Sequence, residues 1–454
     1  MAGVEEISGE ITADRRLTKN KRYLLKGNVL VTNGATLTID PGTIIKGDKA
    51  SNAVLIIGRG AKINAVGTAT EPIVFTSNQP KGSRTYGDWG GVIILGRAVN
   101  NQNTDQPIEG LPTNPKFVYG GNSDNDNSGI MRYVRIEFCG IALQPGSEIN
   151  GLTMGSVGSG TTIEYVQVSY SGDDSFEWFG GTVNGKYLIA YRGFDDDFDT
   201  DFGYTGKVQF GLALRDPFVA DQSQSNGFEA DNSASSTGNP VSAGIFSNIT
   251  YVGPSRIVRG TGAGDGVENP FFGRGIHLRR NTSQSVFNSI IIGSNLAGIS
   301  LDGSDVQAKY ENPATQLSER IQLKGNIIAG TRPTSLPVRG GDFAWERLID
   351  PGNPSSLTEF AAPEISGSID HTAVFNANNK VVNVADLQMN NLIANSRITN
   401  PELLPGTSSV ALTGAVFTDK AADAYFQKVA FRGAFGTSNW AAGWTNFDPQ
   451  NTDY

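Results

Sequence analysis

The amino-acid sequence predicts an all-β fold, a single-stranded right-handed parallel β-helix solenoid with an N-terminal cap and a loop-rich C-terminal cap. Two observations predict this fold class. Short β-branched and aromatic runs return at near-constant spacing through the first 330 residues. Glycine is also abundant, with 56 residues among 454, which is about twice its average frequency. Since glycine allows the tight turns that join short strands, both observations indicate a chain that coils and repeats.

The first four apolar runs set the expected length of a coil. They occupy residues 37–39, 55–57, 73–75 and 92–94, and their first residues are separated by 18, 18 and 19 positions. One turn of a parallel β-helix uses about 18 to 25 residues, and neighbouring coils stack about 4.8 Å apart. We therefore expect these four runs to lie in successive coils.

Apolar triads continue the repeat in the middle of the chain. Their first residues are separated by 32, 21 and 21 positions, which indicates successive coils, the first of them carrying an inserted loop. Within each triad the apolar residues alternate with others, such as Gln167 and Gln209, as expected for strands with one buried face. The residues predicted to point inward are Val134, Ile136 and Phe138, then Val166, Val168 and Tyr170, then Tyr187, Ile189 and Tyr191, and finally Val208, Phe210 and Leu212.

The repeat also sets the expected boundaries. We predict that residues 1–30 cap the first coil, because an open solenoid end exposes strand edges and core. Residues 31–330 form the solenoid, and residues 331–454, where the period fades, form C-terminal coils, long loops and a cap. Within this last part, residues 418–426 have the pattern of a short capped helix.

Composition excludes several functions. The net charge of −9 and the absence of a Lys/Arg stripe argue against a nucleic-acid partner. No apolar run approaches the roughly 20 residues of a membrane helix, so we expect no membrane span in the given chain. Cys139 is the one cysteine, which excludes an intrachain disulfide and a cysteine-based zinc site. Since it lies in an apolar run, we expect an inert, packed thiol.

A second row of strands becomes visible when the coils are superimposed. If Phe176, Phe198, Phe228, Ile276 and Ile299 point inward, the alternation of side chains along a strand sends their polar neighbours outward. We predict that seven of these outward residues, named the acidic ladder, bind a ligand: Glu177, Asp199, Asp201, Glu229, Asp231, His277 and Arg279. Further polar residues extend the ladder or lie on the preceding corners: Ser300, Asp302, Asp173, Asp174 and residues 195–197.

Two interpretations of the acidic ladder do not require catalysis. It can be a solvated outer face with acidic turns, since any solenoid needs polar residues outside. It can also be a ligand-binding face supported by Ca²⁺, because carboxylates about 5 Å apart repel one another and oxygen ligands suit this ion. The expected metal ligands are then Asp199, Asp201 and Glu229.

Catalysis is the third interpretation. Glycosidases place two carboxyl groups roughly 5 to 9.5 Å apart, a range that residues one or two coils apart satisfy. Glu177, Asp199 and Glu229 are the candidates for acid and base. A polysaccharide lyase would use a basic side chain beside calcium, for which Arg279 and Arg192 are the candidates.

Several stretches are similar to a known family. Residues 33–46, 67–77 and 89–92 resemble the first coils of exported right-handed parallel β-helix proteins of the pectin-lyase-like kind, which are abundant in Bacteroidota. Later parts of the same family are resembled by residues 165–174, the acidic run 195–201, and residues 432–436, 439–440 and 443–444. The resemblance implies a location outside the cell or at the outer-membrane surface, with a signal or anchor segment absent from the given chain. As partners we expect a glycan or another extended polar ligand and an outer-membrane transport or surface complex. The resemblance implies no settled activity, so no catalytic residue is transferred.

Together these observations predict an exported or cell-surface β-helix binding protein. It would hold an extended polar ligand, such as a glycan, along the acidic ladder. A polysaccharide lyase or glycoside hydrolase of the same fold is the first alternative, and a structural or adhesive stalk is the second. Fold alone does not separate these functions, because one architecture hosts all of them.

Overall fold

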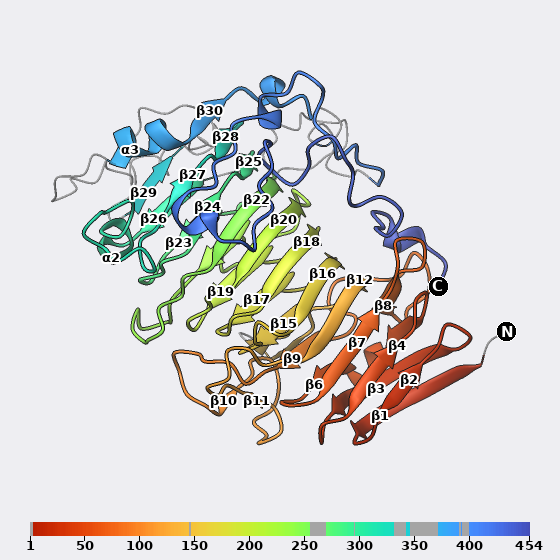
Figure 1. Ribbon diagram of the computed structural model, residues 1–454. Helices are drawn as coiled ribbons and strands as arrows, with labels where there is room; N and C mark the ends of the chain where they lie inside the picture. The colour runs from red at the N-terminus through yellow and green to blue at the C-terminus, as the bar shows by residue number, and fades with distance from the viewer. Residues whose placement is uncertain are drawn as a thin grey trace. The chain divides into compact units, whose positions relative to one another are not determined.

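The computed structural model describes residues 3–144, 147–254, 269–294, 296–330, 342–345, 371–389, 392 and 399–454. The chain forms two compact units. The first unit comprises residues 1–206, 238–240 and 441–454, and the second comprises residues 207–237 and 241–440. Both units are built from coils of a right-handed parallel β-helix, so the predicted all-β solenoid fold is confirmed (Figure 1).

The strands of the first unit stack in three parallel rows. One row contains β2 (Arg15–Leu17), β4 (Thr36–Ile39), β7 (Lys62–Val66) and the first halves of β12 (Gly129–Glu137), β16 (Thr162–Ser169) and β18 (Asn184–Tyr191). The second contains the first half of β3 (Arg22–Val31), β5 (Ile44–Gly47), β8 (Ile73–Ser77) and the second halves of β12, β16 and β18. The third contains the second half of β3, β6 (Val54–Ile57), β9 (Gly91–Leu95), β15 (Leu152–Gly155), β17 (Phe176–Phe179) and β19 (Phe198–Asp201).

The N-terminal residues take part in these rows. β1 (Val4–Ile11) pairs in parallel with β3, and β2 pairs with β4. β1, β2 and β3 therefore occupy most of residues 1–30, the segment expected to cap the first coil, and belong to the stacked rows. Charged side chains cover part of this end, since Glu5 pairs with Arg15 and Lys21, and such charges protect an edge strand from pairing with other chains.

The expected 18-residue period at the N-terminal end is wrong. Residues 37–39 lie in the first row, residues 73–75 in the second, and residues 55–57 and 92–94 in the third. Each coil contains three strands with apolar runs, so runs from different rows return at a spacing that imitates a coil. The partner of Leu37 one coil later is Ile63, and that of Ile56 is Ile93.

The predicted register of the middle triads is correct between the first and second triads and wrong between the second and third. Val134 pairs with Val166, as predicted, but Val166 pairs with Leu188 and Val168 with Ala190. The inward register predicted from Tyr187 is therefore shifted by one residue, and Ile189 lies beside Gln167 on the outer face. The cause is a left-handed backbone bend at the middle of each strand, with φ angles of 52°, 54° and 59° at Tyr133, Tyr165 and Tyr187.

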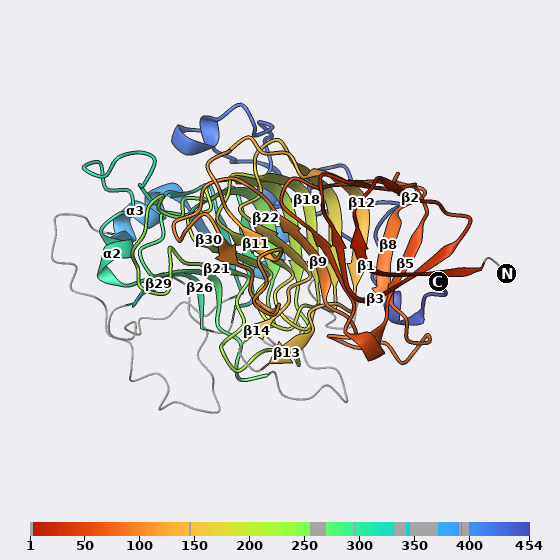
Figure 2. The ribbon, with the colours of Figure 1, turned by 90° about the horizontal axis from the view of Figure 1, so that it is seen from below.

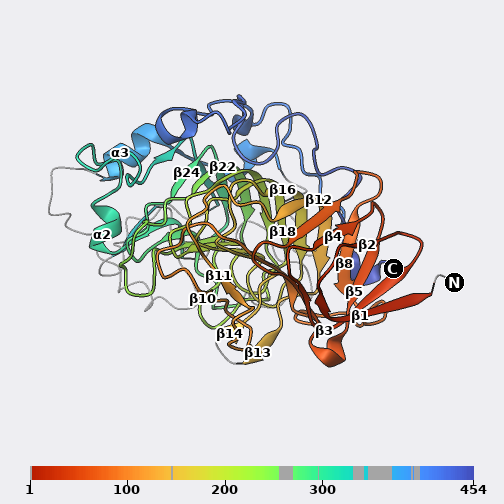
Figure 3. The same cartoon turned by 60° about the horizontal axis from the view of Figure 1, so that its bottom comes forward.

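Two short antiparallel pairs interrupt the coils between β9 and β15 (Figures 2 and 3). They are β10 (Gln106–Pro107) with β11 (Val118–Tyr119), and β13 (Ala142–Gln144) with β14 (Ser147–Glu148). Ile108, Phe117 and Tyr119 of this insertion form one apolar cluster with Ile56 and Ile93 of the third row. The insertion therefore covers the apolar part of the outer face and ends beside its polar part.

Cys139 is buried in the first unit, as expected for a packed thiol. Burial raises the pKa of its thiol to about 12. At neutral pH the thiol is therefore protonated, and a protonated, inaccessible thiol is a poor nucleophile.

The second unit continues the same architecture. One set of parallel strands contains β20 (Lys207–Leu214), β22 (Ile245–Val252), β24 (Ser285–Phe287), β25 (Ile290–Ile292), β27 (Leu323–Lys324), β28 (Ile327–Ala329) and β30 (Lys380–Val382). Another contains β21 (Phe228–Ala230), β23 (Arg274–Leu278) and β26 (Ala297–Asp302), and the antiparallel β29 (Asp342–Trp345) follows β26. Among the residues that the structure describes, this unit has the helices α2 (Ser304–Gln307) and α3 (His371–Asn378). Among the described residues, no helix is long and apolar enough to span a membrane.

The prediction of a helix at residues 418–426 is wrong. The structure has only a 3₁₀ turn, η5 (Asp419–Ala422), and the chain then continues without helical structure. Within the second unit this segment lies against the coils, where the backbone of Gln427 is bonded by the side chain of Gln209. Most of residues 331–398, which were assigned to the C-terminal part, lie outside the described residues.

Candidate functional site

The third row of the first unit carries the first part of the acidic ladder. Thr153, Glu177 and Asp199 are direct partners on β15, β17 and β19. The residues before them, Leu152, Phe176 and Phe198, are fully buried in the coil interior. Alternation along each strand therefore places Thr153, Glu177 and Asp199 on the outer face, about 4.8 Å apart at the backbone. The predicted register between Glu177 and Asp199 is confirmed.

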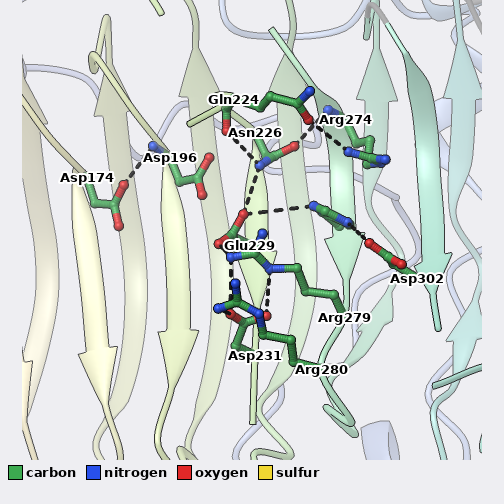
Figure 4. A network of polar contacts seen from close by, with 11 residues as sticks. Asp174, Asp196, Gln224, Asn226, Glu229, Asp231, Arg274, Arg279, Arg280 and Asp302 are labelled. Atoms are coloured by element: carbon green, nitrogen blue, oxygen red, sulfur yellow. Dashed lines mark hydrogen bonds and ion pairs between the residues drawn. The ribbon is translucent and has the colours of Figure 1, made fainter. Parts of the chain in front are cut away.

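Corner residues bring further carboxylates to the same place. Asp174 lies just before β17, and its carboxylate accepts a hydrogen bond of 2.7 Å from the backbone N–H of Asp196 (Figure 4). Carboxylate oxygens of Asp174, Glu177 and Asp199 all lie within 4.8 Å of one another. A second set, Asp173, Asp174 and Asp195, meets the same limit.

This crowding changes the protonation of the cluster. Burial raises the pKa of Glu177 well above its ordinary value, and the charges of Asp199, Glu109, Asp173 and Asp201 raise it further. Burial likewise raises the pKa of Asp174, and the nearby carboxylates Asp173, Asp199, Asp196 and Glu177 add to the effect. A buried carboxylate among like charges is unfavourable, so the cluster favours a shared proton or a bound cation.

Two neutral side chains lie beside Glu177 of this cluster. The Asn150 amide nitrogen donates a hydrogen bond to the Glu177 carboxylate, and Thr153 lies beside Glu177 in register. Both residues are almost completely buried, at 3% and 2% exposed. Within the described part of the chain, Asn150 Oδ1 and Thr153 Oγ1 have no hydrogen-bond partner. Buried polar atoms in native proteins are nearly always satisfied, so these two oxygens indicate a ligand or ordered water.

Sequence reasoning missed Asn150, Thr153 and Glu109. Thr153 pairs with Ile93 in the third row, but the two long insertions between β9 and β15 separate them, so a constant repeat length does not predict this pairing. Glu109 lies in the insertion itself, where burial and the charge of Glu148 raise its pKa. The alternation Leu152, Thr153, Met154 was the available signal, since it matches Phe176, Glu177, Trp178 one coil later.

The second part of the acidic ladder lies in the second unit. Glu229 of β21, His277 of β23 and Ser300 of β26 are direct partners, and Phe228, Ile276 and Ile299 beside them are fully buried. The predicted register is thus confirmed within this unit as well. The roles predicted for these residues remain hypotheses.

Glu229, Asp231, Arg279 and Arg280 form an ion-pair network, beside which His277 and Asp302 lie (Figure 4). The Arg279 guanidinium donates to the carboxylates of Glu229 and Asp231, with 2.8 Å from Nε to Asp231 Oδ1. Arg280 donates to the other oxygen of Asp231 at 2.8 Å. His277 lies between two carboxylates, with Nε2 2.9 Å from Asp302 Oδ2 and Nδ1 3.9 Å from Glu229 Oε2.

The predicted ligand-binding residues therefore fall into two groups. Glu177, Asp199 and Asp201 belong to the first unit, and the other four belong to the second: Glu229, Asp231, His277 and Arg279. Within the first unit the structure brings Asp199 together with Asp174 and Glu177 rather than with Asp201, whose carboxylate accepts a bond from the N–H of Phe202. Glu229, the third expected metal ligand, belongs to the second unit.

Of the two arginines considered as lyase bases, Arg192 packs on aromatic rings. Its guanidinium lies 5.7 Å from the ring centre of Tyr170 and donates a 2.8 Å hydrogen bond to the hydroxyl of that tyrosine. Arg279 belongs to the ion-pair network, where two carboxylates fix its guanidinium.

The stacked coils and their acidic outer face define a parallel β-helix protein, a fold that fits a polysaccharide-associated protein. The chain belongs to the pectate-lyase-like beta helix domain family, which matches residues 9–331. No curated protein and no solved structure matches the chain.

Proposed function

We propose that the protein binds an extended polar ligand, a glycan, along the part of the acidic ladder that each unit carries. The observation that carries the proposal is the register of outward polar side chains, Glu177 with Asp199 in the first unit and Glu229 with His277 in the second. Side chains that repeat about every 4.8 Å offer a row of hydrogen-bonding groups to a ligand that is itself a repeating chain of hydroxyl groups.

In the first unit we propose that a divalent cation, Ca²⁺ in the first instance, takes part in binding. The cluster fits such an ion because its donors are hard oxygens, the carboxylates of Asp174, Glu177 and Asp199. Beside them, Asn150 Oδ1 and Thr153 Oγ1 have no hydrogen-bond partner among the described residues and could complete the ligand set. When bound, the ion would offset carboxylate repulsion and present open coordination positions to hydroxyl or carboxylate oxygens of a sugar. The chain's own residues would hold the ion and fix its height along the ladder.

In the second unit the chain provides its own positive charge. Arg279 and Arg280 pair with Glu229 and Asp231, so the charges of these two carboxylates are balanced without an added ion, and His277 lies beside Asp302. The Arg279 fork is held by two carboxylates, and this leaves little side-chain freedom to lose when a ligand binds. We propose that this group makes direct hydrogen bonds to sugar hydroxyl groups.

A glycan panel with product analysis tests the proposal. The wild-type chain should retain specific oligosaccharides, and the double variant Glu177→Gln with Asp199→Asn should lose affinity at least tenfold, while Glu6→Gln should not. Glu6 is the matched control, because it is an exposed carboxylate of the same unit, paired with Lys26. Unchanged binding by the double variant contradicts the proposed site. If the wild-type protein cleaves an oligosaccharide and the double variant does not, the enzymatic alternative replaces the binding function.

A further inference from the structure

The C-terminal segment of the first unit is held by its backbone. Gln167, which is fully buried on the outer face, donates from Nε2 to the carbonyl of Asn446 and accepts from the N–H of Asn446, both at 2.8 Å. The Tyr191 hydroxyl donates to the carbonyl of Phe447 at 2.9 Å. Arg84 donates to the carbonyls of residues 449 and 452 at 2.7 and 2.9 Å. These contacts do not depend on the side chains of the segment, because they are made to its backbone.

The same device occurs independently in the second unit. Gln209 bonds the backbone of Gln427 through both ends of its side-chain amide, at 2.8 Å each. Asn288 bonds the backbone of Val416 in the same two-point way, at 2.9 and 2.6 Å. Buried amides on the outer faces of the coils are thus a repeated means of binding peptide backbone in this chain.

Aromatic sockets in the first unit add sequence selectivity. Trp444 is fully buried and meets the stacked rings of Tyr133 and Tyr165 edge-on, at 6.0 Å from each. Phe447 meets the ring of Tyr191 edge-on at 5.1 Å. The first unit therefore contacts the segment at two aromatic side chains, Trp444 and Phe447, as well as along its backbone.

Tyr454 occupies the most specific socket. Its hydroxyl donates to Glu137 Oε1 at 2.6 Å, the Arg84 guanidinium lies 4.8 Å from its ring centre, and Lys46 donates to its carbonyl at 3.2 Å. Glu137 is 1% exposed. Its second oxygen, Oε2, has no hydrogen-bond partner among the described residues. A buried carboxylate that accepts one hydroxyl recognises tyrosine and rejects phenylalanine.

We propose that this face of the first unit is a peptide-binding site, distinct from the acidic ladder, that accepts residues 441–454 from a second copy of the chain as well as from its own. The argument for this occupant is complementarity, since every copy carries the matching tryptophan, phenylalanine and tyrosine. Exposed residues 437–439 precede the segment and supply a connection that can lead to either chain. The segment of another copy competes with the chain's own segment, and its share rises with protein concentration. At high concentration, copies therefore exchange segments.

A nicked protein tests the site directly. A protease site replacing residues 437–439 is cut after folding, and the protein is warmed below its melting temperature and cooled with excess fluorescent peptide 441–454. One labelled peptide should bind each nicked chain, and the uncut chain should bind little. The peptide variant Tyr454→Phe should bind at least about tenfold more weakly, because it loses a hydrogen bond to a charged group. Asp453→Asn should bind normally, since the Asp453 side chain is 86% exposed.

Three results with the nicked protein would overturn the proposal. They are no uptake of label by the nicked chain, equal uptake of a scrambled peptide, and equal affinity of the Tyr454→Phe peptide. A second arm uses the unmodified chain, warmed at high concentration and analysed by size exclusion with light scattering. A dimer should form and free peptide should suppress it. A chain that stays monomeric under these conditions refutes exchange between copies.

Discussion

Replacing Glu177 by glutamine should make the protein at least as stable as wild type at pH 8. Glutamine keeps an acceptor for the Asn150 amide while removing one charge from the crowded cluster. Burial and four nearby carboxylates raise the pKa of Glu177 in the folded chain. A raised carboxyl pKa means that the folded state favours the protonated form. The stabilisation is present below the unfolded pKa near 4.5 and is lost as pH rises through the folded value.

The size of the effect follows from linkage. Each pKa unit by which folding raises a carboxyl group corresponds to about 1.4 kcal/mol between its two protonation states. For a unit of roughly 150–250 residues, 1 kcal/mol moves the melting temperature by about 2–4 °C. Asp174 adds in the same direction, because its pKa is raised for the same reasons. Without divalent ions, the wild-type melting temperature should therefore fall by several degrees between pH 5 and pH 8, and that of Glu177→Gln should fall less.

Calcium supplies the second half of this test. At pH 8 it should restore the stability that the charged carboxylates remove, by about 2.7 kcal/mol at one hundred times its dissociation constant. The effect should weaken at pH 5, where protons compete for the same oxygens. Scanning calorimetry at both pH values, with calcium or with a chelator, measures all four conditions. A wild-type melting temperature independent of both pH and calcium would refute the reasoning, and Glu6→Gln should behave as wild type throughout.

Three further predictions concern single buried groups. Phe210→Ala should lower the free energy of unfolding in urea by about 3–5 kcal/mol, because the ring is buried and its centre lies 6.0 Å from that of Phe431. An unfolding midpoint equal to that of wild type would show that packing of this ring does not stabilise the fold. Burial lowers the pKa of Lys420 from 10.5 to about 7, so stability should rise with pH above about 7, and thermal melts of Lys420→Met should lack that rise. Cys139 should react with a thiol reagent only after denaturant is added, and rapid labelling of the native chain would contradict its burial.

The sequence predicts those parts of the fold in which coils follow one another without insertions. Phe176 and Phe198, which are 22 residues apart, pair as expected. Phe228 and Ile276 also pair as expected although 48 residues separate them, because the alternation of side chains identifies both strands. The N-terminal runs failed because three strands per coil offer three apolar runs, and spacing does not say which row each belongs to.

A one-residue error arose at Tyr187 for a different physical reason. Counting every second residue assumes a continuous extended strand, but a φ of 59° at Tyr187 reverses the alternation at that point. The tyrosines at this bend stack outside the coil, with ring centres 4.3 Å apart for Tyr165 and Tyr187. Tyr187 therefore lies at a corner, although its aromatic side chain suggested a place in the core. The same bend occurs at Phe210, where φ is 62° and the ring packs against Phe431.

The two parts of the acidic ladder share one local sequence and differ in the next coil. Phe-Glu occurs at residues 176–177 and again at residues 228–229, with the phenylalanine buried each time. Glu177 faces the carboxylate Asp199, whereas Glu229 faces His277 and is bonded by Arg279. The same pattern thus produces a repulsive carboxylate in one unit and a paired one in the other.

The matched substitutions Glu177→Gln and Glu229→Gln should consequently have opposite effects on stability at pH 8. Loss of the Glu177 charge relieves repulsion, and loss of the Glu229 charge weakens the bonds of Arg279 and Asn226, at a cost of about 1.5–3 kcal/mol. Urea unfolding of both variants beside wild type measures the difference, and Glu6→Gln reports the effect of removing an exposed carboxylate. If both variants are destabilised alike, the neighbouring coil does not decide the energy of a ladder carboxylate, and the electrostatic basis of the proposed cation site is lost.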